Sequence, residues 1–155
     1  MTLTPNMKTL LAAILADARR LEVVPDKPPT CGGRARWGPL WYERQEYEQF
    51  GVRHDLDRWL GHAPTASESA VFSRALGHME TLNLVTRINR WGGGRRATHV
   101  QLTDTGRAEA ERLVADQDAA MAALLKDLAP LAESLGQALP EGPRNPDTSV
   151  DSTGE

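Results

Sequence analysis

The sequence contains a single cysteine, Cys31, among its 155 residues. One cysteine excludes a disulfide within the chain and a zinc site built from several cysteines. Hydrophobic runs are also short: the longest, residues 10–16, falls below the roughly 18–20 residues that a membrane span needs. The first residues lack the basic start and small-residue cleavage site of a secretory signal. We therefore expect a cytoplasmic protein with no membrane association.

Aromatic side chains are scarce, at 5% of the sequence, and six of them lie within residues 37–59. Such a group is typical of an ordinary core cluster that holds the N-terminal segment. A pocket for a small-molecule effector is the alternative interpretation, and both remain open at this point.

Lysine is scarce as well, with three residues against fifteen arginines. The net charge of −3 disfavours a nucleic-acid partner, but the charge is unevenly distributed. Residues 71–112 hold seven arginines against four acidic residues, whereas residues 113–155 hold two basic residues against eight acidic ones. The net charge of the whole chain is therefore negative although its middle part is basic, because the C-terminal part is strongly acidic. Arginine makes forked contacts to phosphate and to guanine edges that lysine does not reproduce.

Helical periodicity and breakers define the expected elements. We expect helices over residues 7–20 with Asn6 as N-cap, 39–50, 53–61, 66–82 and 104–129. Three prolines and three glycines in residues 25–38 predict no regular element there. Pro130 should kink or restart the last helix. Residues 84–90 and 97–102 are rich in β-branched and apolar side chains and flank the glycine-rich segment WGGGRR, which predicts a hairpin.

A short helix, a tight turn, a second helix and a two-stranded hairpin make up a winged helix-turn-helix. The fold class is therefore mainly α with a small β-hairpin wing. We predict an N-terminal helical and aromatic arm (1–52), a DNA-binding core (53–103), a C-terminal helix (104–139) and a disordered acidic tail (140–155). The tail has one apolar side chain, Val150, and cannot bury enough surface to order itself.

Residues 67–113 carry a series of motifs that resembles the winged-helix core of MarR-like transcriptional regulators, and more loosely that of PadR-like ones. The motifs are SRAL (73–76), ME (79–80), NLV (83–85), RR (95–96) and LTDTG (102–106). The resemblance covers about residues 53–115. It implies a recognition helix, a basic wing and a long helix that follows it. Asn83 stands where the family usually has glycine, and the wing has three glycines in place of the usual aspartate before an arginine.

The proposed recognition helix has a core face centred on Phe72, Leu76 and Met79, because each helical residue advances about 100°. Its opposite face is small, polar and basic. We expect DNA contacts from Ser67, Ser69, Ala70, Ser73, Arg74 and His78 on this helix, and from Arg87, Arg90, Arg95 and Arg96 in the wing. Arg74 with the serines would enter the major groove, and the wing arginines would hold the backbone or the minor groove.

In the last helix, apolar side chains recur at spacings of three and four, which is heptad spacing. Val114, Met121, Leu124 and Leu128 are the expected dimer contacts. Packing on the helix's own domain is the alternative. A homodimer would set two recognition helices about one DNA turn (~34 Å) apart.

The sequence favours a dimeric, sequence-specific double-stranded DNA-binding regulator, and more specifically a repressor. The alternatives are a winged-helix module for protein–protein contacts and a plasmid or phage accessory DNA-binding factor. No cofactor is expected, and catalysis is disfavoured. His54, Asp55, Asp57 and His62 match no metal-binding motif of defined geometry. A redox role for Cys31, near Arg34 and Arg36, is a minor hypothesis.

Overall fold

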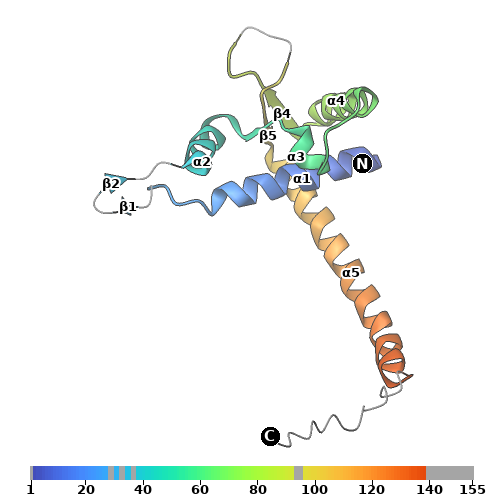
Figure 1. Cartoon of the computed structure of the whole chain (residues 1–155). Coiled ribbons are helices and arrows are strands. Elements are labelled where there is room, and N and C mark those ends of the chain that lie inside the picture. Colours follow the sequence, from blue (N-terminus) through green and yellow to red (C-terminus); the bar gives the residue numbers. More distant parts are fainter. Residues whose placement is uncertain (1, 28–29, 32–33, 36–37, 93–95, 139–155) are drawn as a thin grey trace, which may run out of the picture. The chain divides into compact units, whose positions relative to one another are not determined.

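The computed structural model describes residues 2–27, 30–31, 34–35, 38–92 and 96–138. The chain divides into two compact units, Met1–Gln117 and Asp118–Glu155. Helices and a small sheet build the first unit (Figure 1). Arg95 and the acidic tail from residue 140 lie outside the described residues.

Helix α1 (Pro5–Glu22) is the central core element of the first unit (Figure 1). Its apolar face, including Leu10, Leu11 and Ile14, is fully buried, and it packs against α4, α2 and α3. The helix begins earlier than predicted. Thr4, not Asn6, is the N-cap, and its Oγ1 accepts a hydrogen bond from the Met7 N–H at 3.4 Å. Pro5 takes the first helical position, where the missing N–H costs nothing.

Between α1 and residue 51 lies a segment that holds β1 (Thr30–Cys31), β2 (Arg34–Ala35) and α2 (Pro39–Phe50). The prediction that residues 25–38 form no regular element is wrong, because β1 and β2 pair as antiparallel strands. Helix α2 has the predicted bounds, and none of its residues is fully buried.

A third strand, β3 (Val52–Arg53), follows α2 and was not predicted. It pairs antiparallel with β5 (His99–Leu102), and β5 pairs in turn with β4 (Val85–Ile88), so the sheet order is β3-β5-β4. The predicted helix over 53–61 is therefore wrong at its start: α3 spans Leu56–Leu60, with Asp55 as N-cap.

Helix α4 (Ala66–Thr81) is the predicted recognition helix, and its ends follow the expected chemistry. Thr65 and Glu68 form a capping box in which each side chain bonds the other's backbone N–H. At the other end, Asn83 adopts a left-handed backbone with φ of 55°. The Leu84 N–H reaches back to the Met79 carbonyl at 2.9 Å, which satisfies one of the helix's last carbonyls.

The predicted inward face of α4 is confirmed, since Phe72, Leu76 and Met79 are all buried. Helices α3 and α4 are followed by the β4–β5 hairpin, so the fold is mainly α with a small β-hairpin wing, as the sequence predicts. The last helix, α5, spans Asp104–Ala138 and contains Pro130. Of the two outcomes expected at Pro130, a kink or a restart, the restart is wrong, because α5 continues through this residue. Pro130 is exposed, so water can bind the carbonyl that a proline leaves without an N–H partner.

Candidate nucleic-acid interface

A groove of about 950 Å³ lies among α4, the start of α3 and the β4–β5 hairpin. Six of the ten residues predicted to contact DNA line it. Helix α4 contributes Ser69, Ala70 and Ser73, and the hairpin contributes Arg87, Arg90 and Arg96. The fold therefore brings two segments that are separate in the sequence to one concave surface.

Three other predicted contacts, Ser67, Arg74 and His78, are exposed on α4 but do not line this groove. The predicted α4 residues thus form two sets. Ser69, Ala70 and Ser73 face the hairpin across the groove, and Arg74 projects from the exposed surface.

Two arginines of the hairpin form ion pairs with carboxylates, although the segment around them contains no acidic residue. Arg87 forms an ion pair with Glu80 of α4, with Nη2 at 2.7 Å from the carboxylate. Arg90 forms a close ion pair with Glu46 of α2 and lies over the rings of Phe50 and Trp91, at 5.7 and 5.1 Å. Segment 81–103 has no acidic residue of its own, so these carboxylates come from other helices.

Arg74 and Arg96 differ from these two arginines. Both are exposed, and among the described residues neither forms an ion pair with a carboxylate. Among the described arginines of α4 and the hairpin, they are therefore the ones most available to an outside anion. Arg96 lies in the groove lining.

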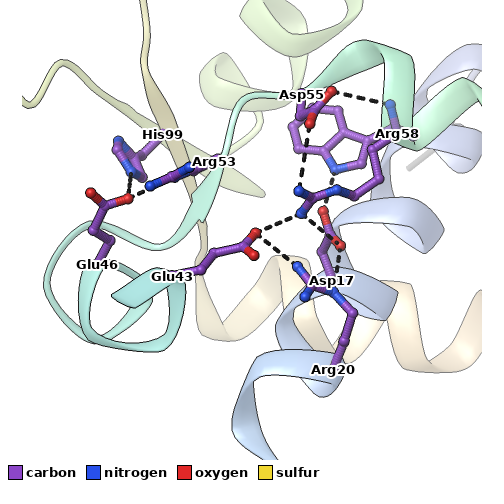
Figure 2. A network of polar contacts seen from close by, with 9 residues as sticks. Asp17, Arg20, Glu43, Glu46, Arg53, Asp55, Arg58 and His99 are labelled. Carbon is purple, nitrogen blue, oxygen red and sulfur yellow. Dashed lines mark hydrogen bonds and ion pairs between the residues drawn. The ribbon is translucent and has the colours of Figure 1, made fainter. Parts of the chain in front are cut away.

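Glu46 joins α2 to the sheet (Figure 2). Its carboxylate accepts a hydrogen bond from Arg53 Nε at 2.7 Å, and its Oε2 lies 3.6 Å from Nε2 of His99. The bond from Arg53, with the charges of Arg53 and Arg90, lowers the pKa of Glu46 despite partial burial. His99 is 4% exposed, and burial lowers its pKa against the opposing effect of Glu46. Sequence reasoning missed this cluster because its members lie far apart along the chain.

A second polar network, also drawn in Figure 2, fixes α2 and α3 to α1. Buried Asp17 accepts a hydrogen bond from the indole N–H of Trp59 at 2.9 Å. Glu43 bridges Arg20 and Arg58 at 2.8 and 2.6 Å. Burial raises the pKa of Glu43, but the hydrogen bonds and positive charges of these two arginines outweigh burial, so the pKa is lowered. The network holds the edge of the groove in place through α3.

Trp37 lies outside the described residues, and the described aromatic side chains of segment 37–59 do not form a closed core cluster. Trp59 is buried, whereas Trp41, Tyr47 and Phe50 are half-buried and Tyr42 is 54% exposed. A separate cavity of about 280 Å³ lies beside Tyr47 and Arg44, over the buried Ile14 and Val52. Of the aromatic residues that the structure describes, Tyr47 alone lines it. An effector in this region stays a prediction.

Comparisons with known proteins identify no relative. No family model, no curated protein and no solved structure matches the chain. The likeness to MarR-like regulators therefore rests on the motifs and on the order of elements alone.

Across the described ranges, no group of three or more His, Cys, Asp or Glu side chains could hold a metal ion. No helix in that part of the chain is long and apolar enough to cross a membrane. The ring of His54 stacks edge-on against Trp59, and His62 pairs with Glu68.

Helix α5 carries the predicted dimer contacts in two different settings. Val114 is half-buried and packs against the core of the first unit. In the second unit, the large apolar side chains Met121, Leu124, Leu125 and Leu128 are between 46% and 61% exposed. Met121, Leu124 and Leu128 follow spacings of three and four residues, and Leu125 lies four residues after Met121 and three before Leu128, so all four side chains fall on one face of the helix.

Proposed function

We propose that the protein is a sequence-specific double-stranded DNA-binding transcriptional regulator of the MarR type, acting as a repressor. The observation that carries this proposal is the groove between α4 and the hairpin. Its lining combines small and hydroxyl side chains of α4 with three arginines of the hairpin. Such a surface is suited to a nucleic-acid backbone, because hydroxyls and arginines are the usual phosphate donors.

The electrostatic balance of the groove supports the same proposal. Four arginines and three carboxylates line it, and two of these carboxylates, Glu46 and Asp55, are engaged within the protein. Glu46 holds Arg53 and Arg90, and Asp55 caps α3 and lies 3.6 Å from Arg58. Arg96 remains unpaired among the described residues. A repressor would act by occupying its operator, with Arg74 reading bases and the hairpin holding phosphates.

The salt dependence of binding tests the wing. Affinity for duplex DNA should fall with salt, and each phosphate contact adds about −0.9 to the slope of log affinity against log salt. Replacing Arg95 and Arg96 by alanine should flatten that slope by about 1–2 units and leave sequence preference largely intact. DNA-binding titrations at several salt concentrations, followed by fluorescence anisotropy, measure this slope.

A matched control for that double variant is Arg19→Ala with Arg112→Ala. Both arginines are exposed and ion-paired, and neither lines the groove, so the loss of charge is the same. The control should keep the wild-type slope. If the Arg95 and Arg96 variant also keeps that slope, the wing is not a phosphate contact.

We propose further that the active form is a homodimer joined along α5. Four large apolar side chains exposed on one helix face are costly in water unless a partner covers them. A second copy presents the same face, and heptad spacing allows the two helices to interdigitate.

Leu124→Asp should therefore abolish the dimer, because it places a charge at the centre of the apolar face. Sedimentation of the wild type should give twice the mass of the 17.0 kDa chain, and the variant should sediment as a single chain. Ala123→Asp adds the same charge on the opposite face of the helix and should leave the dimer intact. A Leu124→Asp protein that sediments like the wild type would end this hypothesis.

A further inference from the structure

We propose that His54, together with Arg87 and Arg96, forms a phosphate-binding floor in the groove and contacts the DNA backbone directly. This inference rests on the proposed function and adds a contact that the sequence did not indicate. It also predicts a second property of DNA binding, namely that the complex takes up a proton.

The position of His54 is fixed from two sides. Its backbone N–H donates to the Thr98 carbonyl at 2.9 Å, which ties the residue to the segment that leads into β5. Its ring meets the indole of Trp59 edge-on, with the ring centroids 5.5 Å apart, and Trp59 is itself held by Asp17. The half-buried imidazole therefore lies in the groove lining at a defined place.

The hydrogen-bonding groups around His54 are those that a phosphate needs. The same lining contains the hydroxyls of Ser69 and Ser73 and the guanidinium groups of Arg87 and Arg96. Neutral imidazole offers one N–H, and the protonated ring offers two, so protonation adds a donor as well as a charge.

The charges that face His54 oppose its protonation in the free protein. Burial lowers its pKa most, then the positive charges of Arg96 and Arg87 from the hairpin side. Asp55, at the start of α3, raises the pKa but does not outweigh them. Asp57 lines the same groove, and α4 contributes Ser69, Ala70, Ser73 and Leu76, none of which is charged. In the free protein these surroundings therefore favour the neutral imidazole.

A bound phosphate reverses this balance. Its negative charge offsets Arg87 and Arg96 and favours the protonated ring, so the pKa of His54 is higher in the complex than in the free protein. The complex then binds more protons than the free protein does. By linkage, affinity for DNA must rise as pH falls through the bound-state pKa, and it must level off below the free-state pKa.

Two measurements on the full chain test the inference. In the wild type, the imidazole resonance of His54 should report a pKa that rises by about one unit when a duplex is added. Affinity for the same duplex should rise from pH 8 to pH 6, and His54→Gln should remove most of that rise. The variant should reduce affinity severalfold at pH 6, toward the roughly tenfold limit of a one-unit rise in pKa, but little at pH 8. His62→Gln, which changes an exposed histidine outside the groove lining, should keep the wild-type pH dependence.

The outcomes separate this inference from the function on which it rests. If the wild type binds duplex DNA with a steep salt dependence, but the pKa of His54 does not rise, His54 is not a phosphate contact and the regulator proposal stands. The same holds if His54→Gln keeps the full pH dependence. If the wild type binds no duplex at any pH, both proposals are overturned.

Discussion

Gly106→Ala is expected to destabilise the first unit by about 3 kcal/mol, because overpacking against rigid backbone cannot relax. Gly106 lies in the first turn of α5, where the helix meets the start of the wing. A Cβ there would lie 1.7 Å from the carbonyl oxygen of Leu84. The neighbouring Thr103 N–H donates to that same carbonyl at 3.1 Å, so the two segments cannot separate without losing this bond.

Chemical denaturation measures the effect, and Gly77→Ala is its matched control. Gly77 lies within α4, and a Cβ there would meet only Arg87 Nη1, at 3.9 Å. Glycine inside a helix costs roughly 0.5–1 kcal/mol relative to alanine, so this variant should be more stable than the wild type. A Gly106→Ala protein as stable as the wild type would contradict the close packing of α5 on the wing.

Arg74→Ala is expected to remove most of the protein's preference for its operator. An arginine that reads a base edge contributes about 1–3 kcal/mol of discrimination, which is roughly fivefold to more than hundredfold in relative affinity. Arg74 is exposed on α4, and within the described residues no carboxylate engages it. Competition between a selected duplex and a scrambled one measures the preference directly.

Two comparison variants make that result specific. Arg74→Lys keeps the charge but loses the fork, so it should retain non-specific affinity and still lose preference. The Arg95 and Arg96 variant should show the opposite pattern, with weaker binding to both duplexes and an unchanged ratio. If Arg74→Ala keeps the wild-type ratio, α4 does not read bases through this residue.

The fold was largely predictable because its main elements are long and periodic. The core face of α4 follows from the spacing of Phe72, Leu76 and Met79, and all three are buried. The turn at Asn83 follows from the tolerance of asparagine for a left-handed backbone. Strand β3 was missed because two residues carry no periodic signal. Its existence depends on pairing with Val100 and His99 in a strand far along the chain.

The electrostatics of the site were less predictable than its residues. The sequence places several arginines in a segment without acids, and this suggests that all of them are free. In the structure, Glu80 of α4 engages Arg87, and Glu46 of α2 engages Arg90. Glu46 lies 44 residues from Arg90, and no local pattern links the two. The position of His54 in the groove could not be predicted for the same reason, because its neighbours come from the hairpin and from the start of α3.

The central claim is that α4 and the β4–β5 hairpin together hold duplex DNA and read its sequence. Selection of bound duplexes from a pool with a randomised centre tests it most directly. We expect the wild-type chain to enrich one shared motif, with two symmetric half-sites about one helical turn apart, and Arg74→Ala to enrich none. Recovery of no common motif by the wild type, or of the same motif by Arg74→Ala, would contradict it.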